Sequence, residues 1–481
     1  MIFKDLEPKN VFQNFKEISN IPRCSLEEKQ ISDYLVQWAN ERNLEVIQDE
    51  WWNVIIKKSG SPGREDEEPV ILQGHMDMVC EKRPESDHDF SKDPILWDIK
   101  EDWIYAKDTT LGADNGIAVA MIMAVLESED ISHPPLEALI TSDEESGMTG
   151  ALKVNPKLFK SKRLINLDSE EEGVACVACA GGENDYVLFK KDIIKRRYPK
   201  TYELKISGLK GGHSGMDIHK GLGNANKLLG RALYRFSKEF SFELLHIEGG
   251  AKPNAIPRDA TAYIGVKEED IKEMQRLVVI LGGEFTKEFA FSDPRVKLSF
   301  EEMVDDGRLA FTDESRDAFI SYLMLVPNGV QSYSQKMNGL VETSTNIGVI
   351  EDNKDEVVFT SALRSSVESH IEYMSNIHEV LARSLGGRFE GKGRYPSWEF
   401  RHKSPLRDVA VKSYKEYANE ELQLESIHAG LECALFDQRF QDLDMISIGP
   451  NIKGAHSPDE RLSISSTKKV YEFFIKILEN I

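Results

Sequence analysis

Between residues 69 and 168 the chain alternates short apolar runs with segments of helical spacing, and this alternation constrains the fold more than any other feature. The runs PVILQ, LEALIT and RLINL have the length of buried strands and are bounded by Gly, Asp or Ser. Between them, GIAVAMIMAVLE and the segment after Thr149 are typical of helices. Strands that alternate with helices predict an α/β fold, with a mixed sheet flanked by helices.

A change of pattern near residue 186 predicts a second domain. Residues 187–395 contain long alternating strands and amphipathic helices, and the order strand, helix, strand, strand, helix occurs twice. This repetition predicts an α+β domain with an internal duplication. The first pattern returns after Trp398. We therefore predict one α/β domain made of residues 1–186 and 396–481, interrupted by an insertion, residues 187–395.

The acidic balance of the chain excludes several classes of partner. Its 481 residues include 82 acidic and 60 basic side chains, and the formal charge is −22. Nucleic acids and anionic membranes bind basic surfaces, so neither is expected as a partner. The N-terminus lacks the long apolar stretch of a signal peptide, and the longest apolar run, residues 116–126, is about half the roughly 20 residues of a membrane-spanning helix. These observations predict a soluble cytoplasmic protein.

The five cysteines do not suggest a disulfide framework. An odd and sparse set suits a reducing compartment. Cys176 and Cys179 form a CxxC pair, but no second pair accompanies it, so buried thiols are favoured over a redox or zinc site. Cys80 follows the predicted strand that ends at His75, and packing is the simpler interpretation of it.

Acidic and histidine side chains follow the predicted strands or begin the predicted apolar helix. In an open α/β sheet, ligands bind outside the carboxyl ends of the strands, so separate segments can converge on one crevice. The candidates are His75 and Asp77 after PVILQ, Asp114 before the apolar helix, Glu144 and Glu145 after LEALIT, Asp168 after RLINL, and His456 after DMISIG.

Some of these residues are more informative than others. Taken alone, an acid such as Asp114 or Asp168 is more often a helix cap or a turn residue. His75 and Asp77 say more, because side chains at i and i+2 of a strand point the same way, and an acid can then hold the second nitrogen of a metal-bound imidazole. Two imidazoles with several carboxylates and no cysteine suit zinc, manganese or cobalt.

The number of carboxylates exceeds what one tetrahedral ion needs, which favours two ions that share a bridging carboxylate. Glu144 and Glu145 are adjacent, so they cannot both point the same way from an extended segment. One of them can bind metal while the other acts as a general base.

The motifs GHMDMV, LGADNG, TSDEESGMTGA, INLDSEEEG and GAHSPDERL together resemble those of the dinuclear-zinc aminoacylase, carboxypeptidase G and dipeptidase family of metallopeptidases. Within it the sequence is most similar to the peptidase D branch, the cytosolic aminoacyl-histidine (Xaa-His) dipeptidases, over almost the whole chain. The resemblance implies a metallopeptidase catalytic domain, and it implies that the insertion is a lid domain.

The resemblance also implies two divalent metal ions, zinc first, with manganese or cobalt as alternatives. The implied ligands are His75 and Asp168 for one ion, Glu145 and His456 for the other, and Asp114 as the bridge. Asp77 would orient His75. Glu144 would be the general base for a hydroxide that bridges the ions, and the Asp114–Asn115 peptide bond would be cis.

In the lid, the resemblance assigns three residues to the substrate. His213, in GGHSG, would stabilise the oxyanion, although from the residues alone it would be a turn histidine between glycines. Asn254, in PNAIP, would lie near the substrate, and Arg364, in SALRSS, would bind the substrate's terminal carboxylate. Asn346 is a weaker candidate from the second half of the duplication, and HAGLEC, from His428, resembles a substrate-facing loop without assigned roles. Family lids often form homodimers, but a doubled lid could supply within one chain what a neighbouring subunit provides.

The sequence thus predicts a metallo-dipeptidase that hydrolyses unblocked dipeptides of the Xaa-His type. Asp168 stands where some members of the family have Glu, and Asp at this position is associated with aminopeptidases and dipeptidases. Two alternatives stay open: an aminoacylase or other amidohydrolase on the same scaffold, and a catalytically silent metal-binding protein.

Overall fold

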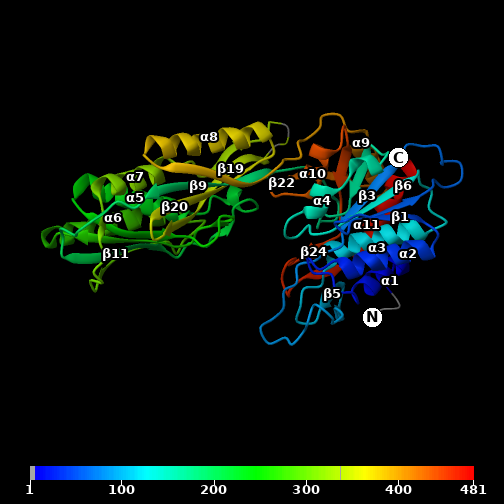
Figure 1. Ribbon diagram of the computed structural model, residues 1–481, viewed down its shortest axis with the longest axis horizontal. Coiled ribbons are helices and arrows are strands. Elements are labelled where there is room, and N and C mark those ends of the chain that lie inside the picture. The colour runs from blue at the N-terminus through cyan, green and yellow to red at the C-terminus, as the bar shows by residue number, and fades with distance from the viewer. Residues whose placement is uncertain (1–5, 336, 338) are drawn as a thin grey trace. The chain divides into compact units, whose positions relative to one another are not determined.

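The computed structural model describes residues 6–335, 337 and 339–481, and the chain forms two compact units (Figure 1). Unit 1 consists of Met1–Ala178, Phe400–Ser426 and Leu431–Ile481. Unit 2 consists of Cys179–Glu399 and the short segment Ile427–Gly430.

Unit 1 is built on an eight-stranded mixed sheet. Its strands lie in the order β1 (Glu45–Gln48), β2 (Val54–Lys58), β6 (Leu136–Thr141), β3 (Val70–His75), β7 (Arg163–Asn166), β23 (Asp444–Ser447), β8 (Val174–Cys179) and β22 (Gln423–Ile427). The four strands β6, β3, β7 and β23 are parallel, and every residue of β3 and β6 is buried. The three apolar runs of the sequence are therefore neighbouring parallel strands, which confirms the α/β prediction.

Helices of unit 1 cover this sheet. The helices are α1 (Lys9–Ile18), α2 (Lys29–Glu41), α3 (Ala113–Glu127), α4 (Thr149–Lys153), α9 (Pro405–Ala418), α10 (Glu432–Arg439) and α11 (Ile464–Asn480). Helix α3 packs on β3 and is covered by α1, while α9 packs on β23 and against α11.

Helix α3 is the apolar run GIAVAMIMAVLE with the residues before it. All its residues from Asn115 to Leu126 are buried, so this helix is covered on every side, as expected of a helix that is apolar all round. Among the described residues, no helix combines the length and apolar character that crossing a membrane requires.

A small four-stranded sheet, which the sequence did not predict, completes unit 1. Its order is β24 (Ile452–Lys453), β25 (Arg461–Ser463), β5 (Trp103–Ala106) and β4 (Trp97–Lys100). Because β25 pairs with β5, the loop between β24 and β25, which contains His456, lies beside the chain that leads from β5 to Asp114.

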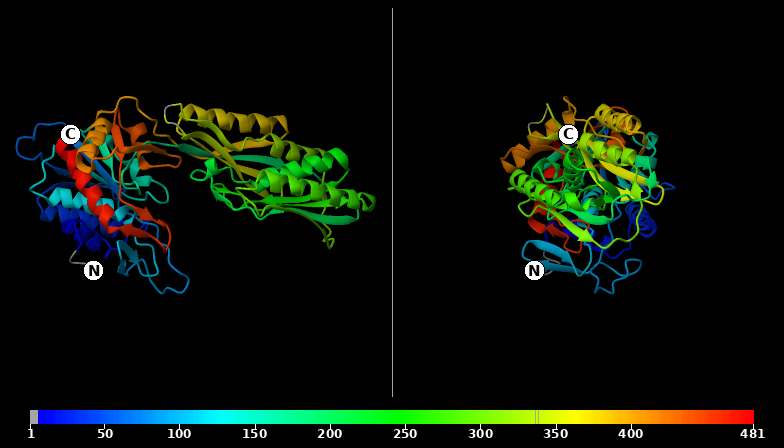
Figure 2. Two further views of the ribbon diagram at one scale, coloured as in Figure 1. Left: turned by 180° about the vertical axis from the view of Figure 1, so that it is seen from behind. Right: turned by 90° about the vertical axis from the view of Figure 1, so that its left-hand side faces the viewer.

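Unit 2 is built on one antiparallel sheet with a repeated topology. The strands follow the order β16 (Lys297–Met303), β11 (Lys200–Ser207), β15 (Ala260–Val266), β13 (Glu243–Gly249), β19 (Val341–Asp352), β20 (Glu356–Ser365), β9 (Gly181–Lys190) and β21 (Arg388–Tyr395), with β18 (Gly329–Tyr333) paired to β19. Its helices are α5 (Ala225–Glu239), α6 (Ile271–Glu288), α7 (Asp313–Leu325) and α8 (Glu368–Ser384), seen from two further directions in Figure 2.

The two halves of this sheet have the same topology. In the first half the chain order β11, α5, β13, β15, α6, β16 gives the strand order β16-β11-β15-β13. In the second half β9, α7, β19, β20, α8, β21 gives the equivalent order β21-β9-β20-β19, and the halves join where β13 pairs with β19. The predicted duplication is therefore present in the topology, although its second half takes its first strand, β9, from before the first half.

Unit 1 contains a disulfide between Cys24 and Cys80, which are 56 residues apart. The expectation that the cysteines form no disulfide is wrong for this pair. The fold brings the segment before α2 alongside the segment after β3, where Cys24 and Met78 form a parallel bridge, and sequence spacing gives no sign of that approach. Cys176, Cys179 and Cys433 are buried, as predicted for the first two.

We predict that reducing this disulfide destabilises unit 1. Since it closes a 56-residue loop in the unfolded chain, it should contribute about 4 kcal/mol to the free energy of unfolding. A thiol reductant should lower the Tm of the wild-type protein in a thermal melt. The double variant Cys24→Ser/Cys80→Ser should have the lower Tm from the outset, and a further reductant effect of the same size in that variant would contradict the prediction.

Candidate metal centre

The parallel strands bring the candidate residues to one edge of the unit 1 sheet. In the register of β3 and β6, His75 lies opposite Thr141, and in that of β3 and β7, Gln73 lies opposite Asn166. The residues that follow these strands therefore emerge side by side at the carboxyl ends of the strands, the edge where ligands bind in open α/β sheets.

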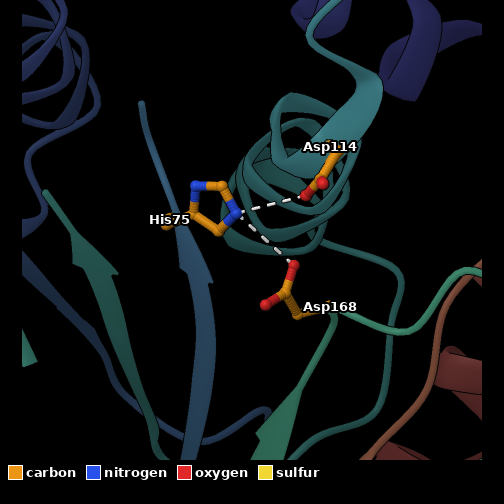
Figure 3. A group of neighbouring side chains, drawn as sticks. All are labelled: His75, Asp114 and Asp168. Carbon is orange, nitrogen blue, oxygen red and sulfur yellow. Dashed lines mark hydrogen bonds and ion pairs between the residues drawn. The ribbon is translucent and has the colours of Figure 1, made fainter. Parts of the chain in front are cut away.

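The first group of candidate ligands surrounds His75. Its Nε2 atom lies 3.2 Å from Asp114 Oδ1 and 3.5 Å from Asp168 Oδ1 (Figure 3). In Figure 3 both carboxylates point toward the same imidazole nitrogen, one from the start of α3 and one from the end of β7. The peptide bond between Asp114 and Asn115 is cis, as the family resemblance implies.

The second group surrounds His456. Its Nε2 atom lies 3.1 Å from Asp114 Oδ2 and 2.8 Å from Glu145 Oε2. Asp114 thus directs one carboxylate oxygen to each histidine. The two groups share this residue, which is the arrangement that a bridging ligand requires.

Asp77 supports both the imidazole of His75 and the segment after β6. Its Oδ1 atom lies 3.2 Å from His75 Nδ1, so the Nδ1–H of a neutral His75 can donate to it and leave the lone pair of Nε2 facing the site. Asp77 also accepts the backbone N–H groups of Glu144 and Glu145 and the Ser25 hydroxyl. Burial alone would raise the pKa of Asp77, but these partners lower it, and the side chain is held as a carboxylate.

Glu144 lies beside the first group. Its Oε2 atom is 3.9 Å from His75 Nε2, farther than the oxygens of Asp114 and Asp168. Burial, and then the charge of neighbouring carboxylates, raises its pKa well above the ordinary value. A carboxylate with a raised pKa, held beside a group of candidate metal ligands, can accept a proton from water and return it.

The electrostatics of both groups fit divalent cations. Burial and neighbouring carboxylates raise the pKa of Glu145 and Asp168, while hydrogen bonds to Asp114 and Glu145 raise the pKa of His456 to about 11. Glu145 Oε1 is buried and has no hydrogen-bond partner among the described residues. A cation in each group would offset this concentration of negative charge, and the nitrogen and oxygen donors suit zinc, manganese or cobalt.

Within unit 2, the structure brings His213 and Asn254 together. Residue His213 pairs with Ala255 through the short strands β12 (Gly212–His213) and β14 (Ala255–Ile256), and the backbone N–H of Ser214 donates to Asn254 O. The Gly215 and Met216 N–H groups point to His213 Nδ1 at 3.3 and 3.0 Å. Nδ1 is therefore the acceptor, and Nε2 carries the proton.

Arg364 projects from β20 in the same unit. Its Nη1 donates to the Tyr395 hydroxyl at 3.0 Å, and its buried Nε has no hydrogen-bond partner among the described residues. Arg364, Tyr395 and Asn254 line a cavity of about 260 Å³. The structure thus places two predicted substrate residues in one cavity.

His428 is a further candidate to which sequence reasoning assigned no role. Its Nε2 lies 2.7 Å from Ser344 Oγ, and burial together with the charge of Arg364 lowers its pKa to about 3. The only signal in the sequence was the HAGLEC motif. Ser344 gave none, because a serine within a strand is common.

Asn346, the weaker candidate, is occupied by structural hydrogen bonds. Its side-chain amide donates to the carbonyl oxygens of Pro253 and Ala255, and its Oδ1 accepts from Asn224. It holds the PNAIP segment in place and leaves little capacity for a ligand.

The chain matches a family model and a characterised relative. Residues 71–480 match the model of the peptidase family M20/M25/M40. The chain is 38% identical over 478 residues to the cytosol non-specific dipeptidase of Escherichia coli (strain K12), which covers 99% of this chain and 98% of that protein.

Solved structures agree with the sequence matches. The crystal structure of aminoacylhistidine dipeptidase from Vibrio alginolyticus superposes with a TM-score of 0.93 at 38% identity, over 100% of this chain and 98% of that one. Aminopeptidase PepT from Bacillus cereus ATCC 10987 superposes over 99% of each chain with a TM-score of 0.57 at 16% identity, a likeness of fold alone.

We predict that divalent cations stabilise unit 1. A cation at 100 times its dissociation constant contributes about 2.7 kcal/mol, which for a unit of this size raises the Tm by about 5 °C. Thermal melts of chelator-treated protein with and without added Zn²⁺ would measure this. The Asp114→Asn variant should show a much smaller shift, because both groups lose the shared carboxylate charge, and an undiminished shift in the variant would contradict the prediction.

Proposed function

The chain belongs to the peptidase family M20/M25/M40, and from that premise we propose that it is a metal-dependent dipeptidase. The observation that carries the proposal is the position of Asp114, which offers one oxygen to the group of His75 and the other to the group of His456. Two relatives that the chain matches over 98% of their length are named as dipeptidases, one non-specific and one for aminoacylhistidine substrates. We therefore propose unblocked dipeptides, Xaa-His among them, as substrates.

The proposed ligand sets follow the two groups of side chains. His75, Asp114 and Asp168 would hold one ion, and Asp114, Glu145 and His456 the other. Zinc is proposed first, with manganese or cobalt as alternatives. When bound, such ions polarise a carbonyl oxygen and lower the pKa of water.

Glu144 is the proposed general base. Its part-buried carboxyl group adjoins the His75 group, but its oxygen is farther from His75 Nε2 than those of Asp114 and Asp168. It would take a proton from the attacking water and then deliver that proton to the amine that leaves when the peptide bond breaks. Asp77 would keep the His75 imidazole oriented during this transfer.

The residues of unit 2 are proposed to bind the substrate. His213 carries its proton on Nε2, and burial together with Arg364 lowers its pKa, so a neutral N–H donor is available for the oxyanion. The guanidinium of Arg364, whose Nε–H has no hydrogen-bond partner in the described part of the chain, suits the terminal carboxylate of a dipeptide. Asn254 lines the same cavity.

We also propose a cytoplasmic location, because the Escherichia coli relative is named a cytosol enzyme. Since disulfides are rare in that compartment, trapping of free thiols in lysed cells would show whether Cys24 and Cys80 are paired there. A homodimer through the lid domain is part of the proposal as well, and analytical ultracentrifugation would measure it.

A substrate panel tests the proposed reaction. Free dipeptides such as Xaa-His should be hydrolysed, a chelator should abolish turnover, and Zn²⁺, Mn²⁺ or Co²⁺ should restore it. Dipeptide amides should be poor substrates, because they lack the carboxylate proposed for Arg364. Preferential hydrolysis of N-acyl amino acids would instead identify an aminoacylase, and a fully metal-loaded protein without any turnover would identify a silent metal-binding protein.

Glu144 and Glu145 should behave differently although they are adjacent. Glu144→Ala should reduce kcat for a dipeptide by roughly 10²- to 10⁴-fold, because the proton acceptor is lost, and should keep both metal ions. Glu145→Ala should lose metal, because it removes a proposed ligand. Metal analysis of both purified variants alongside steady-state kinetics makes the comparison, and retained turnover in Glu144→Ala would exclude it as the base.

A further inference from the structure

The loop that presents Asp114 is held by a buried carboxylate that the proposed chemistry does not use. Glu460 is 2% exposed, and its two oxygens accept four consecutive backbone N–H groups. Oε2 accepts from Leu111 and Gly112 at 2.8 and 2.9 Å, and Oε1 accepts from Ala113 and Asp114 at 2.7 and 3.2 Å. One side chain therefore fixes the whole path of the backbone into Asp114.

Glu460 also belongs to the segment that carries His456. It lies four residues after His456, directly before β25, whose pairing with β5 anchors the segment. Asp114 Oδ2 and His456 Nε2 are 3.1 Å apart. The four hydrogen bonds thus tie together the two chain segments that meet in the second group of ligands, although these segments are far apart in the sequence.

A buried cation holds the same loop through its carbonyl oxygen. Arg23, also 2% exposed, donates from Nη2 to Gly112 O at 2.6 Å and from Nη1 to the carbonyl oxygens of Met76 and Asp77. Burial lowers the pKa of Arg23 to about 10, so the guanidinium is charged at neutral pH. Arg23 thereby ties the loop to the segment of His75.

The loop is shaped to receive these contacts. Gly112 has a φ of 66°, which residues other than glycine rarely adopt. A Cβ atom at this position would lie 2.4 Å from Arg23 Nη2. Burying a carboxylate is costly unless its hydrogen bonds are satisfied, and here both oxygens of Glu460 receive two strong donors. The hydrogen bonds that stabilise the buried Glu460 carboxylate all come from residues 111–114, the loop that carries Asp114.

From this geometry we infer that Glu460 is a positioning residue that sets the Asp114 carboxylate between the two groups of ligands. It touches neither substrate nor metal and acts through the backbone of residues 111–114. The inference rests on the proposed function, since it assumes that Asp114 binds metal. A carboxylate that only stabilised the fold would leave metal affinity unchanged.

The test is Glu460→Gln, in which an amide NH₂ group replaces one of the accepting oxygens and faces two backbone N–H groups. Titration of metal-free protein with Zn²⁺ in the presence of a competing chelator should show affinity weakened by roughly 10- to 100-fold. In kinetics at saturating Zn²⁺, kcat for a dipeptide should fall while KM stays unchanged, because no substrate contact is lost.

Glu137→Gln is the matched control. Glu137 is 4% exposed and accepts the backbone N–H groups of Lys160 and Ser161, but it lies near the start of β6, the end opposite the site. This variant should lower the Tm without changing the affinity for Zn²⁺. An equal loss of affinity in both variants would show a general effect of destabilisation and would overturn the inference.

The remaining outcomes are also decisive. Wild-type affinity for Zn²⁺ in Glu460→Gln would overturn the inference while leaving the proposed dipeptidase intact, because the wild-type protein would still hydrolyse dipeptides. If Glu460→Gln does not fold, Glu460→Asp keeps the charge but withdraws the oxygens by one methylene group. Weakened Zn²⁺ binding in Glu460→Asp would support the inference, and unchanged binding would overturn it.

Discussion

The carboxylate of Asp114, placed between His75 and His456, is the constraint on which the rest of unit 1 depends. One histidine ends a parallel strand in the middle of the sheet, and the other comes from a loop of the small sheet near the C-terminus. Both must come within hydrogen-bond distance of Asp114, at the start of a helix that is buried from Asn115 to Leu126. The parallel register restricts the position of His75, the small sheet restricts that of His456, and the hydrogen bonds of Glu460 restrict that of Asp114.

The carboxyl groups of this site reduce the stability of the folded state. Several part-buried carboxyl groups lie within a few ångströms of one another, and burial raises the pKa of Glu144, Glu145 and Asp168. Buried charges of one sign destabilise a protein unless cations or donors compensate them. The charge of Arg23 and the backbone N–H groups that donate to Asp77 compensate part of this charge, and divalent cations suit the remainder.

Unit 2 is built on a sheet of two topologically equivalent halves. The halves join where β13 pairs with β19, so that one chain forms a continuous antiparallel sheet. Its polar side chains are held in defined states: His213 with Nδ1 as acceptor, His428 neutral against Ser344, and Arg364 oriented by Tyr395. Two imidazoles with lowered pKa thus lie near the permanent charge of Arg364.

The sequence by itself determined the fold class, the duplication and the residues that meet at the candidate metal centre, because apolar periodicity and short motifs are local properties. Only the tertiary structure revealed the small sheet, the Cys24–Cys80 disulfide, the pairing of His428 with Ser344 and the grip of Glu460 on residues 111–114. Each of these joins segments far apart in the chain, and in a single sequence no spacing between residues encodes which distant segments will touch. The sequence therefore pointed to the candidate ligands, and the three-dimensional packing decided how these side chains are held.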